Sequence, residues 1–146
     1  MGRCTSLAGV SQSLAPAVAG IRLSLHVLAA TIWVGGQFTV AGLLPTVRGL
    51  GADAPRAVAR ALARLLWPAY AILVATGFWS VAAIPSVSET MAWKVVLGVK
   101  IGVVALAGIA TWLHGRSKSP GAVAVWGAIG GISSVAALVI GVFLAG

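Results

Sequence analysis

Four long runs of apolar residues alternate with short segments that hold most of the charges of the chain. A membrane-spanning α-helix needs about 20 apolar residues, because each residue advances about 1.5 Å and the hydrocarbon core is about 30 Å thick. All four runs are long enough. They predict helices at residues 23–44, 54–84 (with the membrane span at 65–84), 93–114 and 121–145. We therefore expect an all-α integral membrane protein, built as a four-helix transmembrane bundle.

The composition agrees with a single membrane domain. Hydrophobic residues make up 60% of the 146 residues and charged residues 8%, with a mean hydropathy of +1.05. A soluble domain has about 25% charged residues. Residues 1–20 are small and rich in Ser, Gly and Ala, and are predicted to form a flexible tail, so the membrane domain occupies residues 21–146. Any function must be built inside this bundle or at its rims.

The net charge of +8 is interpreted as a topology signal. Basic residues fall between the apolar runs, not on a polar face interleaved with aromatic residues, so we expect no nucleic-acid partner. The first and third connections share six of them: Arg48, Arg56, Arg60, Arg64, Arg116 and Lys118. The opposite side has three: Arg3, Arg22 and Lys94. The positive-inside rule then predicts an inner (plasma) membrane protein with cytoplasmic basic connections and extracytoplasmic termini.

A basic ridge is predicted at the start of the second helix. Arg56, Arg60 and Arg64 recur every four residues and so share one face of a helix. We expect this ridge to contact anionic lipid headgroups at the cytoplasmic face. Docking of a partner protein is the alternative. Asp53, two residues before Pro55, is predicted to cap the same helix.

Ionisable residues inside the membrane are the best candidates for function, because a charge at mid-bilayer costs at least about 2.5–3.5 kcal/mol. On the first helix, His26, Trp33 and Gln37 lie along one face, and Lys100 lies on an inward stripe of the third helix. By helix rise, His26 and Lys100 lie at similar depth, whereas His114 is about 30 Å from the outer end of its helix. We expect a polar pocket of His26, Lys100, Gln37 and Trp33 in the outer half. The alternatives are a neutral, hydrogen-bonded His26 and a Lys100 that extends toward the headgroups.

His26 is the candidate ligand of a metal ion or a haem. Cys4 and Met91 fall on the same predicted side and are further copper-ligand candidates, since copper accepts imidazole and sulfur ligands. No catalytic residue is predicted. The two carboxylates, Asp53 and Glu89, fall on opposite sides of the membrane, which excludes paired acid/base hydrolysis. Gly127-x-x-x-Gly131 is a spacing that fits close helix packing.

Three segments carry a resemblance to a known family. LHVLAATIWVGGQFTVAGLLPTVR, with His26 and Trp33, resembles the first helix of the copper resistance protein D (CopD) membrane domain. RALARLLWPAYAILVATGFWSV, with Thr76-Gly77, resembles its next helix, and WKVVLGVKIGVVALAGIATWLHGR, with Lys100, its Lys-bearing helix. The overall match covers about residues 21–145. HemJ-type protoporphyrinogen oxidases are a related set that share the helix-one His, a Trp seven residues on and the later Lys.

The CopD resemblance implies a four-helix domain linked to copper uptake across the inner membrane, with His26 and Lys100 as the family's membrane-embedded His and Lys. Copper handling or transport, with copper as the bound ion, is therefore the leading hypothesis. A b-type haem protein with His26 as axial ligand, and with redox or porphyrin-oxidising activity, is the alternative. An accessory membrane subunit without a ligand is the third. Besides the lipid bilayer, the partners left open are a second copy of the chain and an extracytoplasmic metal-binding protein.

Overall fold

The structure, a computed structural model, describes residues 17–83 and 90–145 and is all-helical within them. It contains four helices: α1 (Ala17–Gly49), α2 (Ala54–Ala82), α3 (Met91–Arg116) and α4 (Pro120–Ala145). Each helix is long and apolar enough to cross a membrane. The prediction of a four-helix transmembrane bundle is confirmed, and the chain is a multi-pass membrane protein.

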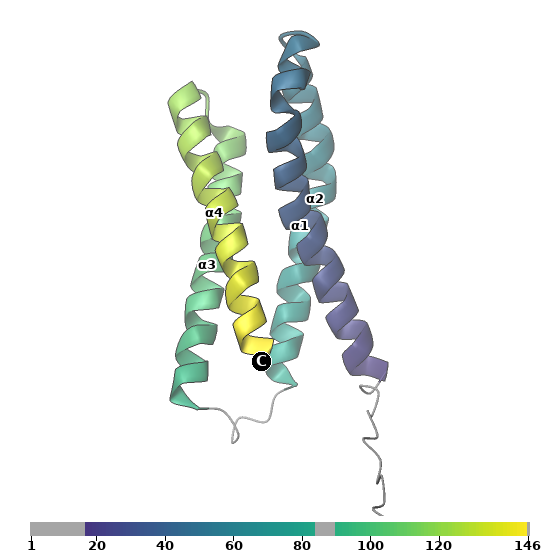
Figure 1. Ribbon diagram of the computed structural model, residues 1–146, viewed down its shortest axis with the longest axis vertical. Coiled ribbons are helices and arrows are strands. Elements are labelled where there is room, and N and C mark those ends of the chain that lie inside the picture. Colours follow the sequence, from purple (N-terminus) through teal and green to yellow (C-terminus); the bar gives the residue numbers. More distant parts are fainter. Residues whose placement is uncertain (1–16, 84–89, 146) are drawn as a thin grey trace, which may run out of the picture.

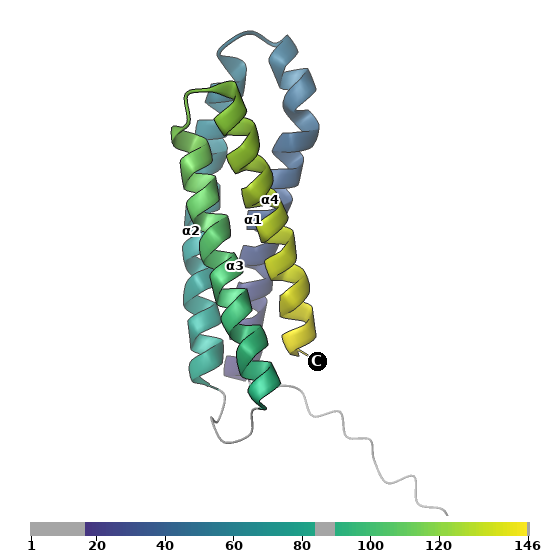
Figure 2. The same cartoon turned by 90° about the vertical axis from the view of Figure 1, so that its left-hand side faces the viewer.

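The helices form two antiparallel hairpins that lie side by side (Figure 1). α1 packs along α2, and α3 packs along α4, while α1 and α4 make the smaller contact that joins the two hairpins. The connections after α1 and after α3 lie at one end of the bundle, which we call the loop end (Figure 2). The start of α1 and the end of α4 lie at the opposite end, which we call the terminal end.

α1 is longer than the sequence predicted at both ends. It begins at Ala17, so residues 17–20 are helical and not part of a tail, and it continues through Pro45 to Gly49. A proline removes one backbone hydrogen bond, and neighbouring bonds can hold a transmembrane helix together across the gap. The chain then reverses at Gly51, whose φ of 129° favours glycine over residues with a side chain. The rest of the predicted tail, including Cys4, lies outside the described residues.

Asp53 occupies the N-cap position of α2, but its side chain makes no capping hydrogen bond. Its backbone is already helical (φ −92°, ψ −13°), whereas a capping side chain needs an extended backbone to reach the first amides. Pro55, the second residue of the helix, also has no amide hydrogen to offer. The sequence therefore predicted the correct N-cap position, but the predicted hydrogen bond from the Asp53 side chain does not form. α3 does have such a cap, since the Thr90 hydroxyl accepts a hydrogen bond from the Trp93 amide at 3.2 Å.

Most buried side chains among the described residues are small or weakly polar, and Trp33 and Leu66 are larger ones that are also buried. Ala29, Ala69, Ala107 and Ala110 are buried inside the bundle, whereas large side chains such as Phe143 face outward. Lipid gives large apolar side chains no reason to turn inward, so close helix contact favours small ones. The closest approach is at Gly108 of α3, which lies against the ring of Tyr70 from α2 and leaves no room for a Cβ atom.

Candidate functional site

A cavity of about 400 Å³ opens between the helices at the terminal end. All four helices contribute to its wall, with most of the lining from α2 and α3. We call it the terminal cavity. Apolar side chains form most of the wall, and the polar ones are Arg22, His26, Tyr70, Ser80, Trp93 and Lys100. Its volume falls in the range of about 300–1,000 Å³ that is typical of small-ligand sites.

His26 reaches this cavity from α1 in a defined orientation. Its Nδ1 atom lies 2.9 Å from the hydroxyl oxygen of Thr76 on α2. That hydroxyl donates its single proton to a backbone carbonyl, since it lies 2.7 Å from the oxygen of Ile72. This contact favours a neutral imidazole in which Nδ1 donates to Thr76 and Nε2 carries no proton. The ring lines the cavity wall, so an unprotonated Nε2 could accept a ligand or a metal there.

Lys100 lines the same cavity from α3 and is half-buried. Its ammonium group lies against the backbone of α4 at Gly141, where a Cβ atom would stand 2.9 Å from Nζ. Arg22 adds a second cation from α1. Of the two acidic residues, Asp53 lies at the loop end and Glu89 lies outside the described residues. The described wall thus has two cations and no carboxylate.

Trp33 and Gln37 lie away from the terminal cavity, in a hydrogen-bonded cluster at mid-bundle. The Trp33 indole and the Gln37 amide both donate to the hydroxyl of Ser134 on α4, at 3.0 Å and 3.1 Å. Ser134 donates in turn to the carbonyl of Gly130 at 2.7 Å. The single polar pocket that the sequence predicted is therefore divided in two, because Trp33 and Gln37 lie about 10 and 16 Å further along α1 than His26.

The remaining predicted site residues lie apart from the cavity. Met91 is the first residue of α3, is 77% exposed and does not line the cavity. Cys4 lies outside the described residues. Within residues 17–83 and 90–145, no three His, Cys, Asp or Glu side chains come together as a metal site would require. Of the two proposed copper ligands within the described residues, His26 lines the cavity and Met91 does not.

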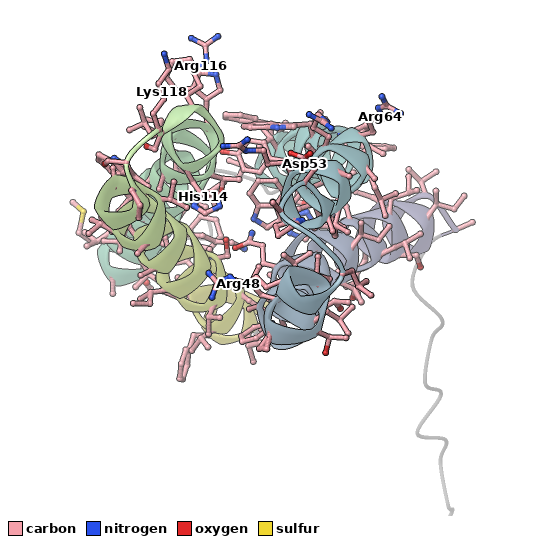
Figure 3. The ribbon with its side chains drawn as sticks, turned by 90° about the horizontal axis from the view of Figure 1, so that it is seen from above. Arg48, Asp53, Arg64, His114, Arg116 and Lys118 are labelled. Carbon is pink, nitrogen blue, oxygen red and sulfur yellow. The ribbon has the colours of Figure 1, made fainter. Side chains whose placement is uncertain are left out.

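Arg56, Arg60 and Arg64 are all exposed on the loop-end half of α2. Viewed from the loop end, Arg64 points outward, as do Arg116 and Lys118 from the other hairpin (Figure 3). The Arg116 guanidinium also lies 4.4 Å from the centre of the Trp112 ring, in a cation–π contact. Both basic connections thus put their charges at one end of the bundle.

Three polar residues make contacts that the sequence did not predict. Thr76 orients His26, and Ser134 anchors the mid-bundle cluster. Tyr70, the single tyrosine of the chain, donates to the carbonyl of Val104 at 2.9 Å and packs beside Trp33 and Trp67. A polar side chain within an apolar run is a sign that the residue makes a specific contact. The sequence alone does not show which neighbouring helix that side chain faces.

Comparison of the chain with family models, with curated proteins and with solved structures finds no match. Function must therefore be inferred from the residues themselves and from the terminal cavity.

Proposed function

We propose that this multi-pass protein is a CopD-like membrane protein whose terminal cavity binds b-type haem, with Nε2 of His26 as the atom that would hold the iron. The observation that carries the proposal is the hydrogen bond between Nδ1 of His26 and the Thr76 hydroxyl, which orients a ring that lines the cavity wall. Ligating histidines commonly have their second ring nitrogen held in this way. The resemblance of the helices bearing His26 and Lys100 to CopD and HemJ-type proteins supports the same assignment.

The charge of the cavity wall favours an anionic ligand. Arg22 and Lys100 both line the wall, and cations within the membrane are costly unless an opposite charge accompanies them. Haem b combines a large apolar ring with two propionate carboxylates. Arg22 and Lys100 would neutralise those carboxylates, while the apolar wall from α2 and α3 would cover the ring. Bound haem would supply one-electron or porphyrin redox chemistry.

Copper handling is the second candidate. It is supported by the CopD resemblance and by the same Nε2, which is an atom type that copper accepts. Against it, a copper ion would add positive charge beside Arg22 and Lys100, and like charges at short range repel strongly in a low-dielectric site. Met91 and Cys4 would have to supply sulfur, and Met91 lies outside the cavity wall.

The visible spectrum of the protein, expressed with an ample haem supply and purified in mild detergent, tests the proposal. We expect a Soret band that His26→Ala removes. His114→Ala is the matched control, because the other histidine of the chain lies at the loop end, and we expect it to keep the band. Absence of the band from the wild-type protein contradicts haem binding. In that case, copper that the wild type retains and His26→Ala loses favours copper handling. If the wild type binds neither haem nor copper, the result favours an accessory subunit.

We also propose that the loop end faces the cytoplasm, so that Arg56, Arg60 and Arg64 contact anionic headgroups and both termini are extracytoplasmic. The exposed basic side chains of both connections support this orientation through the positive-inside rule. Reporters fused to the C-terminus provide the test. Alkaline phosphatase should be active there, and green fluorescent protein should be dark. The reverse result contradicts the orientation.

A further inference from the structure

A second and larger hollow lies where the two hairpins meet, between α1 and α4. It has a volume of about 690 Å³ and is lined by α1 and α4 alone. We call it the α1–α4 groove. It shares no lining residue with the terminal cavity. Its wall is apolar, with Phe38 and Ile140 among its residues, apart from two polar groups, the Gln37 carboxamide and the Ser134 hydroxyl.

Gly131 leaves space in this groove that the chain itself does not use. A Cβ atom placed on Gly131 would meet only the Gln37 side-chain oxygen, at 4.0 Å. The neighbouring Gly130 differs, because a Cβ atom there would lie 3.0 Å from the Thr111 hydroxyl. Packing within the chain thus explains the glycine at 130 but not the one at 131. The lack of a side chain at Gly131 leaves exposed backbone on the groove wall beside the Gln37 side chain.

Gln37 presents that polar group to the groove with unused hydrogen-bonding capacity. One amide hydrogen is donated to Ser134 at 3.1 Å. The second amide hydrogen and the side-chain oxygen have no hydrogen-bond partner among the residues that the structure describes. Gln37 lies only about 6 Å from the midpoint of α1 by helix rise, deep in the apolar part of the bilayer. An amide hydrogen without a partner is costly at that depth, so a hydrogen-bond acceptor is favoured beside it.

We propose that the α1–α4 groove binds a lipid-soluble quinone, whose ring carbonyl accepts the second amide hydrogen of Gln37 while the ring lies over Gly131. The ligand must be apolar to enter the groove from the bilayer, and it must carry an acceptor at mid-membrane depth. A quinone meets both requirements, because its carbonyl oxygens belong to a molecule that dissolves in the hydrocarbon region. The ester carbonyls of phospholipids lie near the headgroups instead, so an acyl chain alone would leave the Gln37 amide unpaired.

Binding of decyl-ubiquinone to the full chain in nanodiscs tests this proposal. Captured nanodiscs are extracted, and the quinone retained in excess over empty nanodiscs is quantified by ultraviolet absorption. Gly131→Leu fills the groove without a clash at Cβ, and we expect it to weaken binding at least tenfold. Gln37→Leu removes the amide and should weaken binding about fivefold, as expected for one neutral hydrogen bond.

Gly98→Leu is the matched control, because Gly98 of α3 also has open space around its Cβ position and lies outside the groove. It should bind quinone like the wild type. His26→Ala should also leave quinone binding unchanged, so loss of haem and loss of quinone are separate results. Circular dichroism and thermal unfolding verify that each variant is folded.

Three results would overturn the proposal. In the first, folded Gly131→Leu binds decyl-ubiquinone as tightly as the wild type. In the second, the wild type retains no excess quinone, and the groove holds acyl chains only. In the third, Gly131→Leu halves the mass of the solubilised particle, which identifies a second copy of the chain as the occupant.

Discussion

The two histidines of this protein make similar hydrogen bonds and yet occupy very different surroundings. His26, at the terminal end, bonds through Nδ1 to the Thr76 hydroxyl at 2.9 Å, and its ring lies on a cavity wall. His114, at the loop end, bonds through Nδ1 to the carbonyl of Val123 at 2.7 Å. Its ring lies against α4, where a Cβ atom on Gly127 would stand 2.9 Å from Nδ1. In Figure 3, His114 lies inside the bundle, while Arg116 and Lys118 point away from it.

The difference shows that the first hydrogen bond of an intramembrane histidine does not assign its role. His114 joins the end of α3 to the start of α4 and lines neither cavity, so its bond serves the fold. His26 has its bond on one side and open space on the other, beside Lys100 and Arg22. Whether the ring lines a cavity separates a structural histidine from a candidate ligand.

The largest expected effect comes from reversing the charge at the terminal cavity. Lys100→Glu should weaken haem binding by more than about 100-fold, because an anion opposite the propionates costs several kcal/mol. Lys118→Glu, the same change at the loop end, should leave binding unchanged. Haem titration followed at the Soret band measures both. A copper site would respond with the opposite sign, since Lys100→Glu would then tighten binding.

Removing the support of His26 should have the next largest effect. Thr76→Val deletes the hydroxyl that holds Nδ1, and loss of such a supporting bond typically costs about 10–100-fold in ligand affinity. Thr76→Ser keeps the hydroxyl and should restore most of the affinity. The reduction potential of the bound haem should shift in the valine variant only. Equal affinity and potential in both variants would mean that Thr76 does not position the ligand.

At the loop end, the matching change should affect the stability of the fold and not ligand binding. Gly127→Ala places a methyl group against the His114 ring, and we expect overpacking to lower the free energy of unfolding by about 1–3 kcal/mol. Haem affinity should stay at the wild-type level. Equilibrium unfolding in mixed micelles measures the first quantity. If Gly127→Ala has normal stability but weakened ligand binding, His114 is not a purely structural histidine and the contrast with His26 is wrong.

The smallest expected effect is at Gly141, which also has a side chain against it. A Cβ atom there would meet the Lys100 ammonium at 2.9 Å, but this is the free end of a flexible chain. Gly141→Ala should therefore change the free energy of unfolding by no more than about 0.5 kcal/mol. It should weaken haem binding far less than Lys100→Glu does. A loss of stability as large as that of Gly127→Ala would show that Lys100 is held rigidly.

Much of the fold could be predicted from local pattern. The four apolar runs predicted all four helices, and the ends of α2 and α3 differ from the structure by about two residues. The larger differences are at α1, where the helix continues through Pro45, and at Asp53, which makes no capping bond. Both depend on the backbone conformation at one residue, and hydrophobic periodicity says little about that.

The pattern of apolar and charged residues is enough to show that this chain lies in a membrane, how many times it crosses, and which few ionisable residues lie within the spans. Those properties follow from the free-energy cost of placing polar groups in hydrocarbon. This cost depends on the composition of each segment and not on its neighbours in the fold. The packing of the helices was needed to show that His26 and Lys100 share a cavity while Trp33 and Gln37 bond to Ser134 at mid-bundle. The physical reason is that helix periodicity fixes the face of a residue on its own helix, whereas its neighbours depend on how four helices are rotated and displaced against one another.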